Sequence, residues 1–205
     1  EQMKKEGAVI VDPVTTSTDL FKMASMDTSM GNLEYKWAFN AYMADRGPNQ
    51  PVKNLAELIA SGKFHPRLKE NYEKSEAALP MEKNPEYAAR YRGRAALKKL
   101  LEDLLEKYDL DAFVYPVRSG ALPKAGTWPL ANGISGQSVS DYCGLPAITV
   151  PGGFTSDGLP QGVEFMAKTF EDAKLLQIAY GYEQISHHRK LPSLTPALPG
   201  EVFEY

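Results

Sequence analysis

The stretch from Gly144 to Met166, GLPAITVPGGFTSDGLPQGVEFM, constrains the fold of this chain more than any other. Ala147 to Val150 carry no charged side chain, which is typical of a strand buried on both faces. A Pro-Gly-Gly sequence at 151–153 then bends the chain, and Asp-Gly at 157–158 supplies a turn. A second strand is predicted from Gly162 to Met166, where glycine allows another backbone to approach closely. The two runs predict neighbouring strands of one sheet, a hairpin that serves as scaffold.

Helical periodicity precedes and follows this hairpin. One helix is predicted from about Pro85, and it carries its apolar side chains at helical spacing on Tyr87, Tyr91, Leu97, Leu101, Leu104, Leu105 and Tyr108. A short buried strand from Ala112 to Tyr115 follows at once, and such a unit is typical of a largely parallel sheet. A second helix begins near Glu171 and turns Leu175, Ile178, Ala179, Tyr182 and Ile185 inward. The pattern favours an α/β fold with helices flanking a central sheet.

The first third of the chain predicts shorter helices. Residues 33–44 place Trp37, Ala41 and either Tyr42 or Ala44 on one helical face. Asn54 caps a helix that Gly62 closes, and a polar helix follows Pro66. The beginning of the sequence predicts a helix end at Gly7 and a strand from Ala8 to Val11, so we expect a further N-terminal region.

Composition excludes several classes of protein. The net charge of −3 and the pI near 5.7 leave no basic surface for nucleic acid or for an anionic membrane. One cysteine, Cys143, allows neither an intrachain disulfide nor a multi-cysteine zinc site, which fits a reducing compartment. We find no signal peptide and no apolar run of the roughly 20 residues that cross a bilayer, and expect a cytoplasmic location.

A segment from Val117 to Ser135 is rich in glycine, proline and alanine and shows no periodicity. Loops of this length within compact domains are commonly functional. This one leaves the end of a predicted strand, which is where ligands bind in α/β sheets. We therefore predict substrate-pocket residues at Val117, Trp128, Ile134 and Ser135. Trp128 could contact a substrate side group or could anchor the loop to the core.

Several reactive side chains have an ordinary structural reading. Ser135 and Ser138 lie in GISGQS, which is not a G-x-S-x-G elbow, and are interpreted as cap or turn residues, with a substrate contact as the alternative. His187 and His188 are adjacent at a helix end, point in different directions and suit its negative pole better than a metal ion. Cys143 is interpreted as a buried filler. A cysteine hydrolase using it with His65, His187 or His188 is a distant alternative.

Five phrases, in this order and spacing, resemble the C-terminal half of the amidase signature family: GAVIVDPV, YDLDAFVYP, GLPAITVPGGF, GLPQGVEFMAKTFEDAKLLQIAYGYEQ and HHRKLP. The resemblance covers nearly the whole chain and is loosest in the first hundred residues outside the opening strand. It implies a single α/β domain on a mixed central sheet flanked by helices. Residues 1–205 then form a partial amidase domain that ends in an extended Pro-rich tail over residues 190–205.

The same resemblance implies a function. Enzymes of that family hydrolyse carboxamides with a Ser, cis-Ser, Lys triad, which uses no metal or organic cofactor. This chain has no GGSSGG-like run, so no catalytic residue is carried over to it. We expect the chain alone to be inactive, and we expect its partners to be an N-terminal amidase half and a small-molecule or peptide amide. The isolated chain should self-associate or be marginally folded. The alternative is a noncatalytic binding or assembly module with half of an amidase fold.

Overall fold

The computed structural model describes residues 1–17, 30–117, 137–191, 195 and 198–201. The chain divides into two compact units. The first, called the sheet unit, comprises Glu1–Thr15, Leu104–Ser140 and Leu145–Tyr205. The second, called the helical unit, comprises Thr16–Asp103 and Asp141–Gly144. The helical unit therefore interrupts the sheet unit in sequence.

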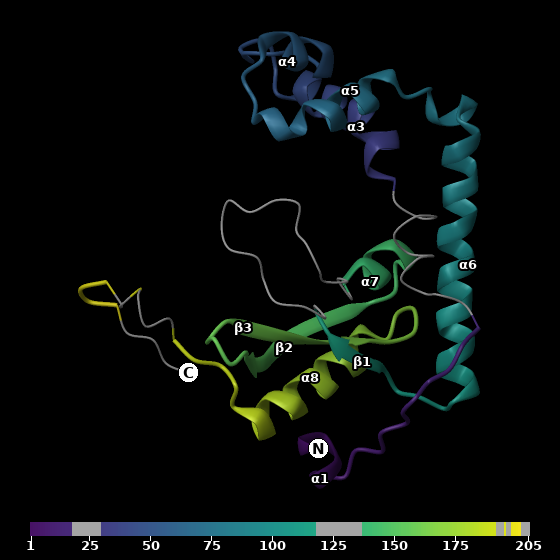
Figure 1. The fold of residues 1–205 in the computed structure, drawn as a ribbon, viewed down its shortest axis with the longest axis vertical. Helices are drawn as coiled ribbons and strands as arrows, with labels where there is room; N and C mark the ends of the chain where they lie inside the picture. Colours follow the sequence, from purple (N-terminus) through teal and green to yellow (C-terminus); the bar gives the residue numbers. More distant parts are fainter. Residues whose placement is uncertain (18–29, 118–136, 192–194, 196–197, 202–205) are drawn as a thin grey trace. The chain divides into compact units, whose positions relative to one another are not determined.

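The sheet unit contains three described strands in the order β1-β3-β2 (Figure 1). They are β1 (Phe113–Pro116), β2 (Ala147–Phe154) and β3 (Pro160–Met166), and both neighbouring pairs are antiparallel. Ala147 lies opposite Met166 and Val150 lies opposite Val163, so the predicted pairing within the hairpin is confirmed. The Pro-Gly-Gly bend is a β-bulge between Pro151 and Gly153, and β2 continues past it. The hairpin is therefore longer than its sequence pattern indicated.

Two strand predictions need correction. The strand expected from Ala112 to Tyr115 begins one residue later, and its neighbour is β3, which runs antiparallel to it. For the described strands, the expectation of a largely parallel sheet is wrong, because the hairpin supplies the neighbour of β1. The strand expected from Ala8 to Val11 is also wrong: this stretch has no regular secondary structure, and Val9 is 89% exposed.

The predicted helix end at Gly7 is confirmed by its backbone hydrogen bonds. Helix α1 (Gln2–Lys5) ends in a Schellman motif, in which the Ala8 N–H donates to Met3 O and the Gly7 N–H donates to Lys4 O. Gly7 has φ of +95°, a conformation that glycine adopts without steric cost.

Helix α8 (Asp172–Ser186) covers one face of the sheet (Figure 1). Its buried residues Leu175, Ala179 and Tyr182 recur at intervals of four and three and pack with Val150 and Phe165 in one core cluster. The Phe165 and Tyr182 rings meet edge to face, with centroids 5.7 Å apart. The inward face predicted for this helix is confirmed for these three residues, and Ile178 also packs against the cluster.

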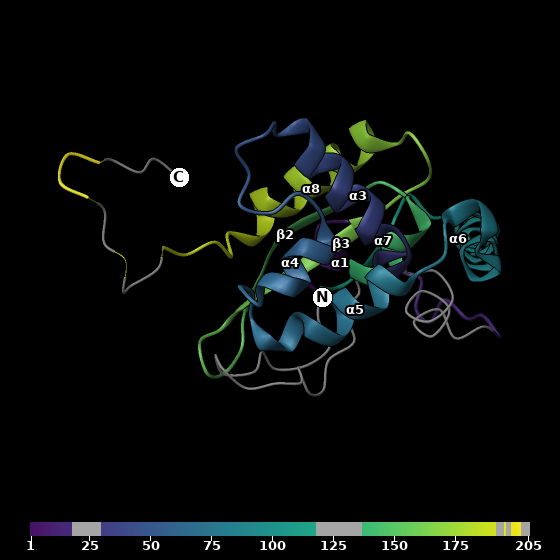
Figure 2. The ribbon, with the colours of Figure 1, turned by 90° about the horizontal axis from the view of Figure 1, so that it is seen from above.

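In the helical unit, α3, α4 and α5 lie side by side (Figures 1 and 2). The elements of this part of the chain are α3 (Gly31–Asp45), α4 (Leu55–Ser61), the 3-10 turns η1 (Pro66–Leu68) and η2 (Met81–Lys83), α5 (Lys69–Ala77) and α6 (Pro85–Lys107), whose last turn belongs to the sheet unit. The predicted cap of α4 is confirmed: Asn54 Oδ1 accepts from the Glu57 N–H at 2.8 Å, and Gly62 ends the helix with φ of +63°.

Two predicted helix faces are wrong in part. In α3, Ala41, Tyr42 and Ala44 are exposed, because the helix contacts α5 through Tyr35 and α4 through Asn40 instead. The Tyr35 ring stacks on Phe39 within the helix and on Tyr72 of α5, at 5.8 and 5.4 Å. In α6 the stripe of leucines is buried, whereas Tyr91 is 64% exposed. None of the helices within the described residues is both long and apolar enough to span a membrane.

Candidate functional site

The most distinctive chemical group in the described structure is the carboxyl of Glu164, which lies on the central strand of the sheet and is 3% exposed. Tyr115 of β1 and Thr149 of β2 are its direct partners in the strand register. Residues directly opposite on neighbouring strands project to the same face. The three side chains therefore share one face of the sheet, and neighbouring Phe165 occupies the other face with α8.

Three hydroxyl groups donate to this carboxyl. Glu164 Oε1 accepts from Tyr115 Oη at 2.6 Å and from Ser140 Oγ at 2.8 Å, and Oε2 accepts from Thr149 Oγ1 at 3.2 Å. Ser140 belongs to α7 (Gln137–Cys143) and is itself 6% exposed. Tyr115, Ser140, Thr149 and Glu164 are called the hydroxyl–carboxyl cluster below.

The cluster compensates the burial of its carboxyl with hydrogen bonds in place of an opposite charge. The ion pairs of the described residues do not include Glu164. A buried carboxyl without partners would be strongly destabilising, and each hydroxyl supplies one donor. With three donors already directed at it, the carboxyl is suited to holding neighbouring chain segments in place.

Val117 is the one predicted pocket residue that the structure describes. It follows β1 directly, and its N–H donates to Gly162 O at 3.0 Å. A Cβ on Gly162 would lie 2.8 Å from Val117 Cγ2 and 2.8 Å from Thr149 Cγ2, so both side chains lie over this glycine. Val117 therefore lies on the face that carries the hydroxyl–carboxyl cluster. Trp128, Ile134 and Ser135 lie outside the described residues.

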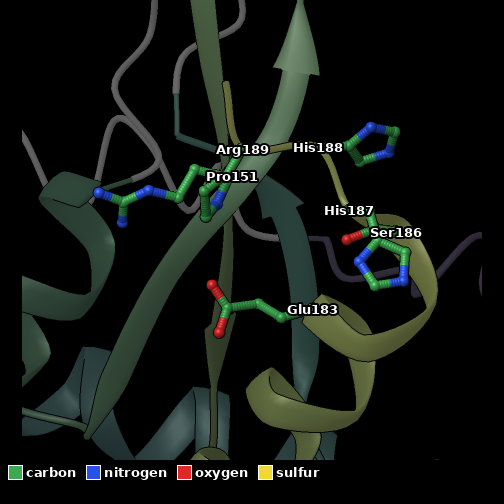
Figure 3. A pocket seen from close by; sticks show the side chains of 6 residues that line it. All are labelled: Pro151, Glu183, Ser186, His187, His188 and Arg189. Atoms are coloured by element: carbon green, nitrogen blue, oxygen red, sulfur yellow. The ribbon is translucent and has the colours of Figure 1, made fainter. Parts of the chain in front are cut away.

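A surface cavity of about 280 Å³ lies between β2 and the C-terminal end of α8 (Figure 3). Its lining consists of Pro151, Glu183, Ser186, His187, His188 and Arg189. Figure 3 shows the two histidine rings pointing in different directions, as predicted. His188 Nε2 lies 3.2 Å from Gln2 Oε1, so the imidazole is engaged with α1.

The other reactive residues also have structural surroundings. Cys143 is 7% exposed, which confirms its predicted burial. His65 Nδ1 accepts from the Arg67 N–H at 3.2 Å and so caps η1. Over the described part of the chain, no group of three or more His, Cys, Asp or Glu residues could hold a metal ion. The side chain of Ser138 lies outside the described residues.

Sequence reasoning treated the hairpin as scaffold and missed the cluster on it. The sequence does contain a signal, because Glu164 is an acidic residue within the predicted strand from Gly162 to Met166, where its two neighbours are apolar. Buried charged groups require partners, and that requirement alone points to a polar site. The identity of the partners was not accessible, since they lie 15, 24 and 49 residues away in sequence.

Comparison with known proteins agrees with the family resemblance of the sequence. Residues 1–176 match the family model described as Amidase. A probable amidase of Arabidopsis thaliana is 28% identical over 201 residues, which cover 93% of this chain and 36% of that protein.

Two solved structures have the same fold over much of the chain. An amidase family protein from Bacillus anthracis superposes with a TM-score of 0.68 and 25% identity, covering 92% of this chain and 34% of that one. The peptide amidase of Stenotrophomonas maltophilia superposes with a TM-score of 0.61 and 30% identity, covering 78% of this chain and 33% of that one. The chain thus spans about a third of the length of these relatives. It has an α/β fold and belongs to the amidase family.

Proposed function

We propose that this chain is the C-terminal portion of an amidase that hydrolyses a carboxamide C–N bond. The observation that carries the proposal is the family match over residues 1–176. In the complete enzyme, a serine supplied by the other portion attacks the amide carbonyl, ammonia or an amine leaves, and water hydrolyses the acyl-enzyme. The present chain contributes sheet scaffold and part of the substrate pocket.

Within this proposal, Val117, Trp128, Ile134 and Ser135 form a wall of the pocket. Supporting this role, Val117 lies at the end of β1, and strand ends are where loops carry binding residues in α/β folds. The full reading frame should contain a Gly/Ser-rich segment with a preceding lysine. A noncatalytic binding or assembly module would lack both.

The test compares ammonia or amine release from a panel of carboxamides by this chain and by the product of the full reading frame. We expect turnover only for the longer protein. Turnover by the rigorously purified chain, lost on mutating Ser135, Ser138 or Cys143, would contradict the assignment. A full-length product that binds but never cleaves amides would favour the noncatalytic module.

The pocket assignment is tested with Trp128→Ala in the complete enzyme. A pocket residue should change the ranking of amides by kcat/KM while the melting temperature and the reactivity of the nucleophile stay unchanged. A uniform loss across all amides with a lower melting temperature would identify Trp128 as an anchor of the loop instead.

A further inference from the structure

One oxygen atom of Glu164 accepts hydrogen bonds from two residues, one that precedes residues 118–136 in the sequence and one that follows them. Tyr115 belongs to β1 and precedes residues 118–136 in the sequence, whereas Ser140 belongs to α7 and follows them. Both hydroxyls donate to Glu164 Oε1, at 2.6 and 2.8 Å. Thr149 donates to the other oxygen from β2, which does not adjoin that segment.

We propose that Glu164 is a positioning residue, which fixes the end of β1 and the first turn of α7 relative to each other through this shared acceptor. The proposal rests on the proposed function in one respect: the two fixed stretches flank the part of the chain assigned to the substrate pocket. The positioning role itself depends only on the hydrogen bonds to Glu164.

Strand β1 and helix α7 are both short and have little stability by themselves. Strand β1 has four residues and, among the described strands, β3 as its one neighbour. Helix α7 has seven residues, well below the length at which a helix is stable by itself. A common acceptor on the central strand therefore joins two short elements to the strand that has a neighbour on each side.

Burial makes the shared acceptor effective. Glu164 and Ser140 are 3% and 6% exposed, so water cannot easily replace a lost donor or acceptor there. Hydrogen bonds to a charged group are stronger than neutral ones. Removing the acceptor therefore breaks one hydrogen bond from β1 and one from α7 at the same time.

Two substitutions at Glu164 separate acceptor geometry from bulk. Glu164→Gln keeps an oxygen that can accept from Tyr115 and Ser140, and its amide NH2 can donate to the Thr149 hydroxyl. Glu164→Leu has similar bulk and no acceptor. Thr149→Val is the matched control, because it removes a hydroxyl from the same carboxyl without touching either flanking stretch.

The experiment is hydrogen–deuterium exchange of the 205-residue chain, followed in peptides that contain β1 and α7. Glu164→Leu should speed exchange in both peptides by about tenfold or more, whereas Glu164→Gln and Thr149→Val should match the parent chain. Phe165→Leu, on the opposite face of the same strand, should speed exchange chiefly in α8. Exchange in β1 and α7 that rises equally in Phe165→Leu and Glu164→Leu would overturn the proposal, since it would report general loosening.

Single-hydroxyl variants decide the matter should Glu164→Leu fail to fold. Tyr115→Phe should speed exchange in the β1 peptide, and Ser140→Ala should speed exchange in the α7 peptide. Because β3 holds Glu164 Oε1 in place, the double variant should show in each peptide the same increase as the single variant that affects that peptide. Unchanged exchange in both single variants would contradict a positioning role.

An activity measurement then separates this proposal from the proposed function. In a complete enzyme that cleaves amides, Glu164→Leu should change KM and the substrate ranking, Glu164→Gln should restore both, and Thr149→Val should leave them unchanged. Absence of amide cleavage by the parent enzyme would count against the proposed function only, because the exchange measurements would still support or contradict the positioning role.

Discussion

Val117 lies directly over Gly162: the Val117 N–H donates to Gly162 O at 3.0 Å, and Val117 Cγ2 occupies the space that a Cβ on Gly162 would need. Gly162 was predicted to allow close approach of another backbone, whereas the atoms that lie closest to the position of its missing Cβ belong to the side chains of Val117 and Thr149. The Val117 side chain, just after β1, and the Thr149 side chain, on β2, both lie over this glycine. The position of a proposed pocket residue thus depends on the absence of a side chain on the central strand.

Gly162→Ala should destabilise the sheet unit by about 1–3 kcal/mol, because the new methyl group would meet two side chains at 2.8 Å. Thermal unfolding measures the loss. The control is Gly181→Ala in α8, where a Cβ would meet nothing within 4 Å. This substitution should stabilise the helix by up to about 1 kcal/mol. Equal effects of the two substitutions would contradict the close packing described at Gly162.

Asn54→Ala should destabilise the helical unit by about 1 kcal/mol, because it removes the acceptor for the Glu57 N–H at the start of α4. Asn54→Asp or Asn54→Ser should retain most of the stability, since each can accept the same hydrogen bond. Denaturant unfolding followed by circular dichroism compares the three variants. An unchanged stability of Asn54→Ala would show that α4 is held by packing alone.

The pKa of Tyr35 is raised to about 12 by burial and by its hydrogen bond with Tyr72. Between pH 10 and 12 the unfolded chain therefore ionises this phenol while the folded chain keeps it neutral, so folding stability falls as pH rises through that range. The hydrogen bond with Glu34 raises the pKa of Tyr87, and burial raises the pKa of Tyr182, so Tyr35 is one of several late-titrating tyrosines. Ultraviolet titration at alkaline pH should show a late phase that Tyr35→Phe reduces by one phenol. The same variant should reduce the alkaline loss of stability, and an undiminished late phase would contradict the assignment to Tyr35.

The isolated chain should self-associate. Within the described sheet, β1 and β2 are edge strands, and unpaired strand edges offer N–H and C=O groups to another chain. Sedimentation velocity over a range of concentrations should show species larger than the monomer. Ala147→Lys, which places a charge at an exposed position of edge strand β2, should reduce association. A strictly monomeric chain with a sharp melting transition would favour an independent module.

Local sequence patterns predicted the features that depend on local interactions. The cap at Asn54, the Schellman end at Gly7 and the hairpin from β2 to β3 are each set by residues close together in sequence. The inward face of α8 was also predictable, because its apolar spacing matches the helical repeat.

Features that depend on distant partners were not predictable in this way. Ala8 to Val11 has the composition of a strand, but a strand requires a neighbour that a local pattern does not reveal. Tyr91 has helical spacing and yet is exposed, since packing partners decide which part of a long helix is covered. The hydroxyl–carboxyl cluster joins three strands and a helix, so only the tertiary structure could identify its members.

The hydrogen bond from Gln2 Nε2 to Ile185 O, 2.7 Å long, has a consequence for the order in which the chain can fold. It joins residues 183 positions apart, and the sheet unit is assembled from three stretches of sequence between which the helical unit is inserted. During synthesis, most of the helical unit leaves the ribosome long before α8 exists. Contacts of such long sequence separation form slowly. The helical unit should therefore acquire structure first. Helix α1 should pack against α8 only after α8 has been synthesised, late in the synthesis of these residues.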